Sequence, residues 1–277
     1  MFDTTPEAKV AGGSLDEIGQ QEQLPFPFNQ RAFCRYEPIE KKIDFARVLV
    51  VNDLLRYEDD VSDLARSEWN GTLETRLKLE RKISGMACEN ISKNLWRLIK
   101  KPKLMQVHLS EVAQAVKAYR PDAIVMSGTL TDFDYYNQNY IAKFKEFIHE
   151  TRTPVLAICG AHQLVGMSFG MNLTTLDHLD PAQKRTNRVN EYQYRFVRIV
   201  DAEDPIYSGI QDEQSGIWQD YTKEARVLRV WQNHGLQVEG VPEEFKLLAT
   251  SYLCKNQAMV KLSEGQMIYA VQFHLEK

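Results

Sequence analysis

The chain has 277 residues, a formal net charge of −4 at pH 7 and a 43% share of hydrophobic residues. That length can bury a substantial core, as one large domain or as one domain with an appendage. The negative net charge offers no electrostatic case for a nucleic-acid partner, and no apolar run approaches the roughly 20 residues of a membrane-spanning helix.

Four cysteines are scattered along the chain without a Cys-x-x-Cys spacing: Cys34, Cys88, Cys159 and Cys254. This distribution argues against a metal site or a disulfide framework, so we expect neither a metal nor another cofactor. The first residues lack the basic head and the apolar segment of a secretory signal. We therefore expect a reducing, cytoplasmic setting, in which a thiol stays available as a nucleophile.

Residues 1–40 are polar and irregular, with four prolines and a Gly-Gly-Ser run, and are expected to form a flexible or loosely docked N-terminal segment. Residues 41–277 are expected to form the main domain. Its first predicted element is a strand over residues 46–52, because a continuous apolar run is typical of a strand buried on both faces.

A helical pattern covers about residues 59–101, where leucine, isoleucine and alanine recur every three to four residues or at multiples of that spacing. We expect this stretch to be a helical insertion. Its end carries a cationic cluster formed by Arg97, Lys100, Lys101 and Lys103. Either this cluster is a solvated helix end, where cations suit the helix dipole, or the stretch is a docking surface for a partner or a cap over the active site.

The rest of the main domain first alternates strands with helices and then becomes rich in strands. Strands are predicted at 105–109, 123–126 and 155–158, with helices at 110–119 and 136–150 between them. Further strands are predicted at 194–200, 227–231, 246–250, 258–262 and 267–273. The alternation predicts an α/β fold with a mainly parallel open sheet and helices on both faces.

Cys159 ends the apolar strand at 155–158 and is followed at once by Gly160. A nucleophile on a sharp strand-to-helix turn needs small neighbours, and Ala157 and Ala161 meet that need. The helix that starts there directs its N–H groups at the sulfur, which favours the thiolate and places the Gly160 N–H for an oxyanion. Taken alone, a buried structural cysteine is an equal alternative.

The end of the chain supplies the partners that a thiol nucleophile requires. His274 and Glu276 lie two residues apart beyond another apolar strand, so they point to the same side. In a parallel sheet, functional groups gather at the carboxyl ends of the strands. The sequence therefore predicts a Cys159–His274–Glu276 triad of nucleophile, base and orienting carboxylate.

Four segments together resemble the class I (triad) glutamine amidotransferases. They are the elbow at 157–163, the terminal Val-Gln-Phe-His-Leu-Glu motif at 271–276, the strand and loop at 121–128, and the Asn-His-Gly loop at 231–238. The last segment is most similar to the glutaminase parts of carbamoyl phosphate synthetase and, more loosely, GMP synthetase. The resemblance covers about residue 47 to the C-terminus and implies the flavodoxin-like fold of that family.

The resemblance also implies roles for individual residues. Cys159 would attack the side-chain amide of glutamine, His274 would transfer protons and Glu276 would orient the histidine. The oxyanion would be held by backbone groups of Gly160 and of Gly128 or Thr129. The positions that match the glutamine-binding residues of the family are Gln163, Asn233 and Gly235, whereas His162 and His234 are expected to be structural.

The chain departs from the family pattern at several of these positions. Thr129 and Leu130 stand where the family usually has Gly-Pro, and a positive φ at the β-branched Thr129 would be costly. Leu275 replaces the proline between the histidine and the glutamate, so the φ of that turn is not preset.

Three functions therefore remain open. The first is a glutaminase that feeds ammonia to an acceptor, with a synthetase or acceptor protein as a partner in trans, because the chain shows no nucleotide-binding glycine loop. The second is a γ-glutamyl hydrolase or peptidase with the same thioester chemistry, although the Asn-His-Gly loop favours glutamine. The third is a non-catalytic binding or regulatory protein on this fold.

Overall fold

The computed structural model describes residues 41–208 and 227–277, so the N-terminal segment expected at 1–40 lies outside the described residues. The parallel half of its main sheet has the order β2 (Ile99–His108), β1 (Ile43–Asn52), β3 (Ala123–Met126), β4 (Val155–Ile158) and β11 (Ile268–Val271). Apolar runs form these strands except for the lysine-rich edge strand β2. Their side chains are buried on both faces at the centre of the sheet, which is why the runs are continuous rather than alternating.

The remaining strands extend this sheet in antiparallel pairs. Beyond β11 follow β10 (Ala258–Lys261), β9 (Lys246–Thr250), β6 (Glu191–Ile199) and β7 (Val227–His234). Within the described residues, this sheet therefore has nine strands. A separate pair, β5 (Leu173–Thr175) and β8 (Leu236–Val238), was not predicted. All five strands predicted after residue 190 are present, with ends shifted by a few residues.

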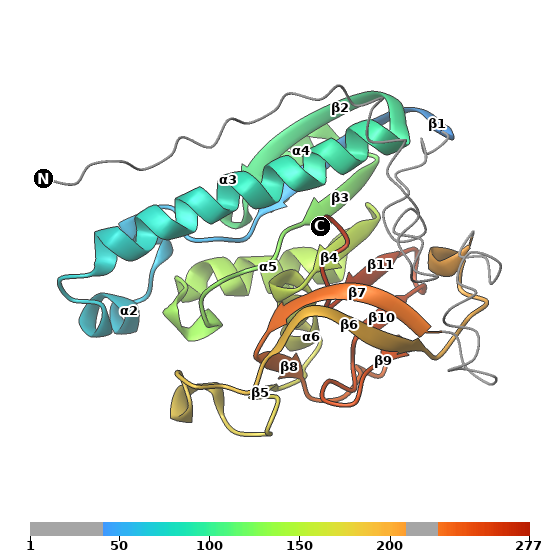
Figure 1. The fold of residues 1–277 in the computed structure, drawn as a ribbon. Helices are drawn as coiled ribbons and strands as arrows, with labels where there is room; N and C mark the ends of the chain where they lie inside the picture. The colour runs from blue at the N-terminus through green and yellow to red at the C-terminus, as the bar shows by residue number, and fades with distance from the viewer. Residues whose placement is uncertain (1–40, 209–226) are drawn as a thin grey trace, which may run out of the picture. The chain divides into compact units, whose positions relative to one another are not determined.

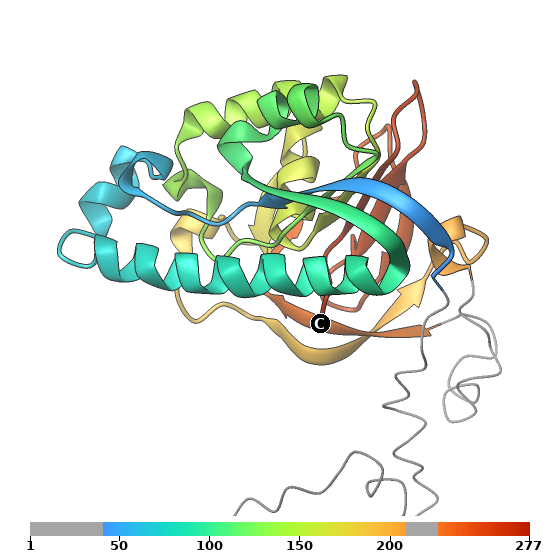
Figure 2. The ribbon, with the colours of Figure 1, turned by 90° about the horizontal axis from the view of Figure 1, so that it is seen from above.

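Helices cover both faces of the parallel half, as Figures 1 and 2 show. The long α3 (Leu73–Leu98) packs on one face, preceded by the short α2 (Asp63–Glu68). On the other face lie α4 (Val112–Tyr119), α5 (Gln138–Glu150) and α6 (Gly160–Ser168). Short 3-10 helices are η2 (Glu58–Asp60), η3 (Leu109–Glu111), η4 (Phe133–Tyr135), η5 (Pro181–Gln183) and η6 (Pro205–Tyr207). The predicted α/β fold is confirmed.

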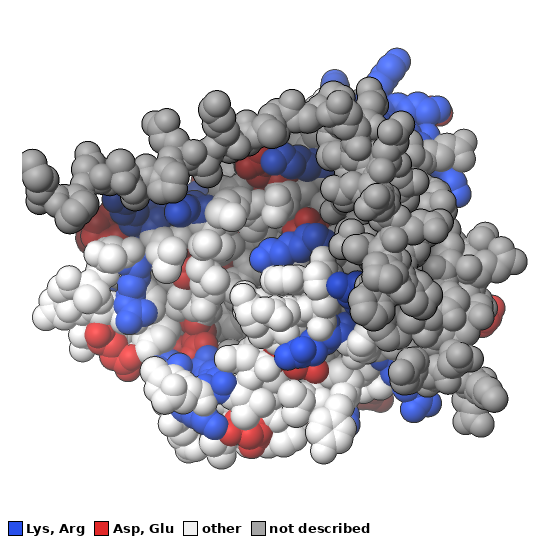
Figure 3. Space-filling view, viewed as in Figure 1, with Lys and Arg blue, Asp and Glu red and all other residues white. Residues whose placement is uncertain are grey.

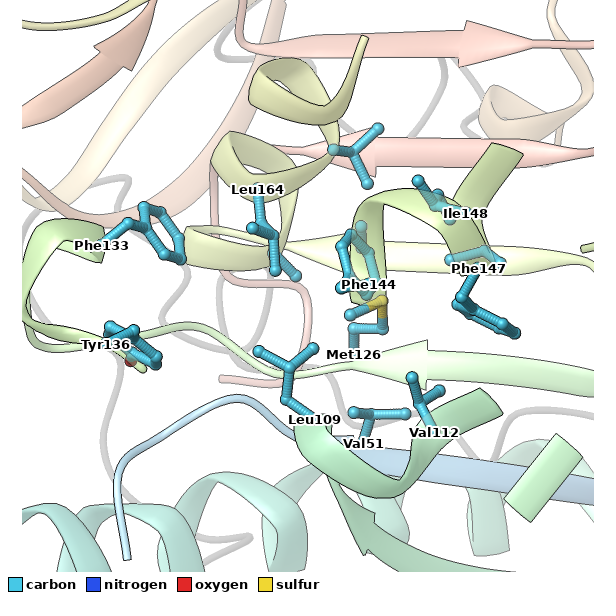
Figure 4. Packing of buried hydrophobic residues seen from close by; sticks show 14 of the residues in the cluster. Val51, Leu109, Val112, Met126, Phe133, Tyr136, Phe144, Phe147, Ile148 and Leu164 are labelled. Atoms are coloured by element: carbon cyan, nitrogen blue, oxygen red, sulfur yellow. The ribbon is translucent and has the colours of Figure 1, made fainter. Parts of the chain in front are cut away.

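The two faces of β1 belong to two different hydrophobic clusters. Leu49 and Val51 join the cluster with α5 and α6, which Figure 4 shows packed around Met126, Phe144 and Leu164. Val48 and Val50 point the opposite way, toward Cys88 and Ile91 on α3. The alternation of side chains along the strand therefore attaches helices to both faces.

The boundary between α3 and β2 differs from the prediction. The helix ends at Leu98 instead of continuing to about 101, and β2 starts at Ile99 rather than at 105. Pro102 explains the difference, because the residue before a proline disfavours helical backbone and a proline is tolerated on an edge strand. β2 is that edge strand, and its lysines Lys100, Lys101 and Lys103 are typical of an exposed sheet edge rather than of a helix end.

The charged side chains of the described surface are of both signs. In Figure 3, basic and acidic residues are interspersed on the visible described face instead of forming one extended basic patch. Among the described residues, no helix is long and apolar enough to cross a membrane.

Candidate active site

Cys159 occupies the strained turn between β4 and α6. Its backbone has φ 53° and ψ −107°, a conformation that residues other than glycine rarely adopt. The Cys159 N–H donates to Val271 O of β11 at 2.7 Å, and its carbonyl accepts from the N–H of Gln163 at 3.1 Å, which begins α6. The turn therefore presents the sulfur at the carboxyl end of β4 and at the start of a helix.

His274 and Glu276 reach the same edge of the sheet because β11 pairs in parallel with β4. The register places Ala270 opposite Ala157 and Val271 opposite Ile158. Beyond the strand, the His274 N–H donates to Trp231 O at 2.9 Å, and His274 Nδ1 lies 2.6 Å from Glu276 Oε1. The two partners expected for Cys159 thus meet each other directly.

Gly128 shows that the sulfur and the imidazole share one space. A Cβ placed on this glycine would lie 3.7 Å from Cys159 Sγ and 3.4 Å from His274 Cε1. His274 Nε2 is buried and has no hydrogen-bond partner of normal geometry among the described residues. The described structure therefore leaves Nε2 open beside the thiol, while Nδ1 is engaged by the carboxylate.

The electrostatics of this space favour a charged histidine. Burial by itself lowers the pKa of His274, but the adjacent Cys159 thiolate and the Glu276 carboxylate outweigh burial and raise that pKa to about 10. The imidazolium form of His274 is consequently favoured at neutral pH.

The loop after β3 packs against the start of α6 at Gly160. A Cβ on Gly160 would fall 2.5 Å from the backbone nitrogen of Thr129 and 2.1 Å from its Oγ1, so no side chain fits there. The strained conformation considered for Thr129 is not present, because Thr129 is not among the residues with positive φ. The backbone of Thr129 therefore lies directly against the N-terminus of α6 without strain.

A chain of buried amides leads to the sulfur. Gln163 Nε2 donates to Gln272 Oε1 and to Leu236 O, each at 3.1 Å, and Gln272 Nε2 lies 3.6 Å from Cys159 Sγ as its donor. Gln272 was not predicted as a site residue, although it stands two positions before His274 in the same motif. The amide nitrogen of Gln163 therefore donates both of its hydrogen bonds to other residues of the protein.

The loop with Asn233 and Gly235 closes another side of the site region. The side chain of Asn233 is exposed near the end of β7. A Cβ on Gly235 would lie 2.2 Å from Asn190 Oδ1. His234, between them, is hydrogen-bonded to Glu191 Oε2 at 3.0 Å and to Leu236 O at 2.9 Å.

Burial lowers the pKa of His162 to about 3, so that residue is neutral.

Two arginines tie this side of the site to the loop that carries Thr129. Arg188 forms a bidentate pair with Asp132, at 2.7 and 2.5 Å, and Arg185 pairs with Asp134 at 2.7 Å. The segment around residues 184–190, which touches Gly235, is thereby attached to residues 132–134. Neither arginine was predicted as a functional residue.

No group of three or more His, Cys, Asp or Glu side chains that could hold a metal ion exists within residues 41–208 and 227–277.

Comparison with known proteins identifies relatives of the chain. The family model described as glutamine amidotransferase class-I matches residues 86–277. A subunit of the glutamine-hydrolyzing GMP synthase from Pyrococcus furiosus is 31% identical over 161 residues, which cover 58% of this chain and 69% of that protein. The glutamine-hydrolyzing GMP synthase from Ruthia magnifica is 27% identical over 165 residues, covering 59% of this chain but 26% of that longer protein.

A solved structure with a similar fold comes from Thermoplasma acidophilum. The protein is described as a GMP synthase subunit, and it superposes with a TM-score of 0.51 at 19% sequence identity. The match covers 83% of this chain and 84% of that one. At this level of identity the likeness concerns the fold.

Proposed function

Because this chain belongs to the class I glutamine amidotransferase family, we propose that it hydrolyses the side-chain amide of glutamine through a cysteinyl thioester. The observation that carries the proposal is the convergence of Cys159 and His274 beside Gly128, with Glu276 Oε1 2.6 Å from the imidazole. In this proposal Cys159 is the nucleophile, His274 the general acid and base, and Glu276 the residue that orients the ring.

In the first half-reaction, the Cys159 thiolate attacks the amide carbon of glutamine and the carbonyl π electrons move to the oxygen. The N–H groups of Gly160 and of Thr129, or of Gly128, stabilise the oxyanion that forms. His274 gives its Nε2 proton to the amide nitrogen, the C–N bond breaks and ammonia leaves. The raised pKa of His274 supports this step, because the proton is in place before the attack.

In the second half-reaction, the neutral imidazole takes a proton from water at Nε2 while the water oxygen adds to the thioester carbon. The tetrahedral intermediate then collapses, breaks the C–S bond and releases glutamate. Cys159 returns to the thiolate and His274 to the imidazolium. Glu276 accepts the Nδ1 hydrogen bond throughout, which keeps Nε2 directed at the reacting atoms.

For substrate binding we propose the loop with Asn233 and Gly235, together with Gln163. The exposed Asn233 and the backbone at Gly235 suit the amino and carboxylate ends of an amino acid. Gln163 uses its amide hydrogens on Leu236 and Gln272, so we assign it a contact through its oxygen or an indirect role through Gln272.

The ammonia acceptor is proposed to be a synthetase or another acceptor protein in trans, in the cytoplasm. The relatives from Pyrococcus furiosus, Pyrococcus abyssi and Thermococcus kodakarensis are each described as one subunit of a glutamine-hydrolyzing GMP synthase, which supports a separate partner. Ammonia at neutral pH is mostly ammonium and no longer nucleophilic, so direct delivery to the partner preserves its reactivity.

The test is ammonia release from glutamine and from a panel of larger γ-glutamyl amides, with and without candidate acceptor proteins. We expect glutamine to be the preferred substrate and Cys159→Ser to abolish release while the circular dichroism spectrum stays native. Cys254→Ser is the matched control, because that buried thiol donates to Asn256 O at 3.3 Å rather than to a residue of the triad.

Two results would count against the proposal. Equal rates with γ-glutamyl peptides would identify a γ-glutamyl hydrolase. A folded protein whose Cys159 is not labelled by a glutamine-like chloroketone, and which releases no ammonia with any partner, would identify a non-catalytic member of the family.

A further inference from the structure

The long helix α3 touches both halves of the proposed active site. One of its contacts reaches the loop after β3 and the other reaches the end of the chain. Figures 1 and 2 both show the C-terminus beside the C-terminal half of this helix. The proposed chemistry gives α3 no role, so these two contacts call for an explanation.

The first contact joins Glu80 to the loop that carries the proposed oxyanion donor. Thr131 Oγ1 donates to Glu80 Oε1 at 2.6 Å, and Thr131 follows Thr129 by two residues. Glu80 is 4% exposed, and burial raises the pKa of its carboxyl group. A carboxylate buried in a helix is costly, so its hydrogen bond to Thr131 holds the loop at a defined distance from α3.

The second contact joins Asn94 to the backbone of Glu276. Asn94 Nδ2 donates to Glu276 O at 3.1 Å. Arg97 Nη1 donates to Asn94 Oδ1 at 3.2 Å, and a guanidinium group has only donors, so the amide oxygen must face Arg97 and the NH₂ group must face Glu276. The direction of the hydrogen bond to Glu276 is therefore determined.

Leu275 explains why the second contact matters. A proline at this position would preset φ and stiffen the turn between His274 and Glu276, and leucine does not. The backbone is instead held on both sides of Leu275: His274 N–H by Trp231 O at 2.9 Å, and Glu276 O by Asn94. Without Asn94, the carboxylate 2.6 Å from His274 Nδ1 would lose its backbone anchor on α3.

We propose that α3 braces the active site, with Asn94 as the positioning residue for Glu276 and Glu80 as the positioning residue for the Thr129 loop. The inference rests on the proposed function, since it concerns the geometry of that same triad. Asn94 acts through Glu276 and then His274, and it touches no reacting atom. The bond from α3 replaces the stiffness that a proline at 275 would supply.

The main experiment uses the full chain and a suppressor design. Asn94→Leu removes the donor, and we expect kcat for glutamine hydrolysis to fall by about 10- to 100-fold with KM nearly unchanged, as for a misplaced catalytic group. Leu275→Pro alone should leave kcat within about twofold of the native value. The double variant Asn94→Leu/Leu275→Pro should recover most of the loss, because the extended backbone of His274 is compatible with a following proline.

Lys93→Ala is the matched control on α3. Its side chain is exposed and pairs with Glu89 four residues earlier, so kcat should not change. For the first contact, Thr131→Val should reduce kcat because valine cannot donate to Glu80, whereas Thr131→Ser keeps the hydroxyl and should remain active. Thermal unfolding of every variant verifies that it is folded.

Native kcat in Asn94→Leu, or a loss that Leu275→Pro does not restore, would overturn the assignment of Asn94. Native activity of Thr131→Val would overturn that of Glu80. A second measurement does not require glutamine. It is the rate at which iodoacetamide alkylates Cys159 at pH 7, measured by mass spectrometry on the peptide that contains Cys159. If the native protein releases no ammonia, the proposed function fails, but the brace still predicts slower alkylation in Asn94→Leu and its recovery in the double variant.

Discussion

His274 and its two neighbours illustrate how single residues set the chemistry of the site. Burial alone would lower the pKa of this histidine, and Cys159 is the first of the causes that raise it to about 10. In Cys159→Ala only Glu276 remains to oppose burial, so we expect the pKa of His274 to fall well below 10. NMR titration of the His274 ring protons in the native and variant proteins measures this change.

The sign of the linked stability follows from the direction of the shift. The pKa of His274 is raised from 6.5, so the interactions of the protonated ring stabilise the native state fully below pH 6.5 and lose that effect as pH rises toward 10. The native protein should lose stability over this interval, and Cys159→Ala should lose less. Cys88→Ala, a buried thiol on α3, should titrate like the native protein. An unchanged His274 titration in Cys159→Ala would show that the sulfur and the ring do not interact.

Residue-scale contacts also mark the limit of what the sequence can predict about the site. The proximity of Cys159, His274 and Glu276 could be predicted, because each follows an apolar strand whose carboxyl end lies at the same edge of the sheet. Asn94 and Glu80 could not, because their partners lie 182 and 51 positions away and polar residues in a helix carry no signal for a distant contact. Gln272 could have been found, since it alternates with His274 beyond the same strand.

At the scale of elements, the buried strands were the most predictable parts of the fold. Strands β3 and β4 match their predicted limits, because continuous apolar runs bounded by Pro and Gly or by polar residues leave few alternatives. The α3–β2 boundary was missed because the lysines around Pro102 suit both a helix end and an edge strand. The short β5 and β8 escaped because three-residue strands have too little periodicity to recognise.

A prediction at this scale concerns the two loops joined by Arg188 and Asp132. The segment at 188–190 lies against Gly235, within 3.3 Å of where its Cβ would be, and the bidentate pair attaches it to the loop after β3. Arg188→Ala should release the segment and raise KM for glutamine by about 10-fold, with a smaller change in kcat, because ground-state contacts at the proposed substrate loop are loosened.

Steady-state kinetics of ammonia release measures this split. Arg66→Ala serves as the control, because its pair with Asp63 is solvent-exposed on α2 and should have no effect. A loss in kcat alone, with native KM, would contradict the assignment of the loop to substrate binding.

At the scale of the whole molecule, both hydrophobic clusters pack on one sheet, so an unfavourable buried residue in that sheet lowers the free energy of global unfolding. Asp53 is such a residue. It follows β1, is fully buried, and neither of its carboxylate oxygens accepts a hydrogen bond of normal geometry from the described residues. Burial raises the pKa of Asp53 well above its ordinary value, and the Ser127 backbone offsets only part of this effect.

An aspartate whose pKa is raised in the folded state destabilises the protein at every pH above its unfolded value. The penalty is absent in acid, where the carboxyl is neutral in both states, and grows as pH rises toward the raised pKa. Asp53→Asn keeps the shape and removes the charge, so it should increase the free energy of unfolding by about 1–3 kcal/mol at pH 8 and by little at pH 4. Urea unfolding at both pH values measures the difference, and Asp63→Asn, on the exposed end of α2, is the control. If Asp53→Asn and the native protein are equally stable at pH 8, other interactions in the sheet offset the cost of burying the Asp53 carboxylate. If Asp53→Asn is less stable at pH 8, the charged carboxylate stabilises the native protein.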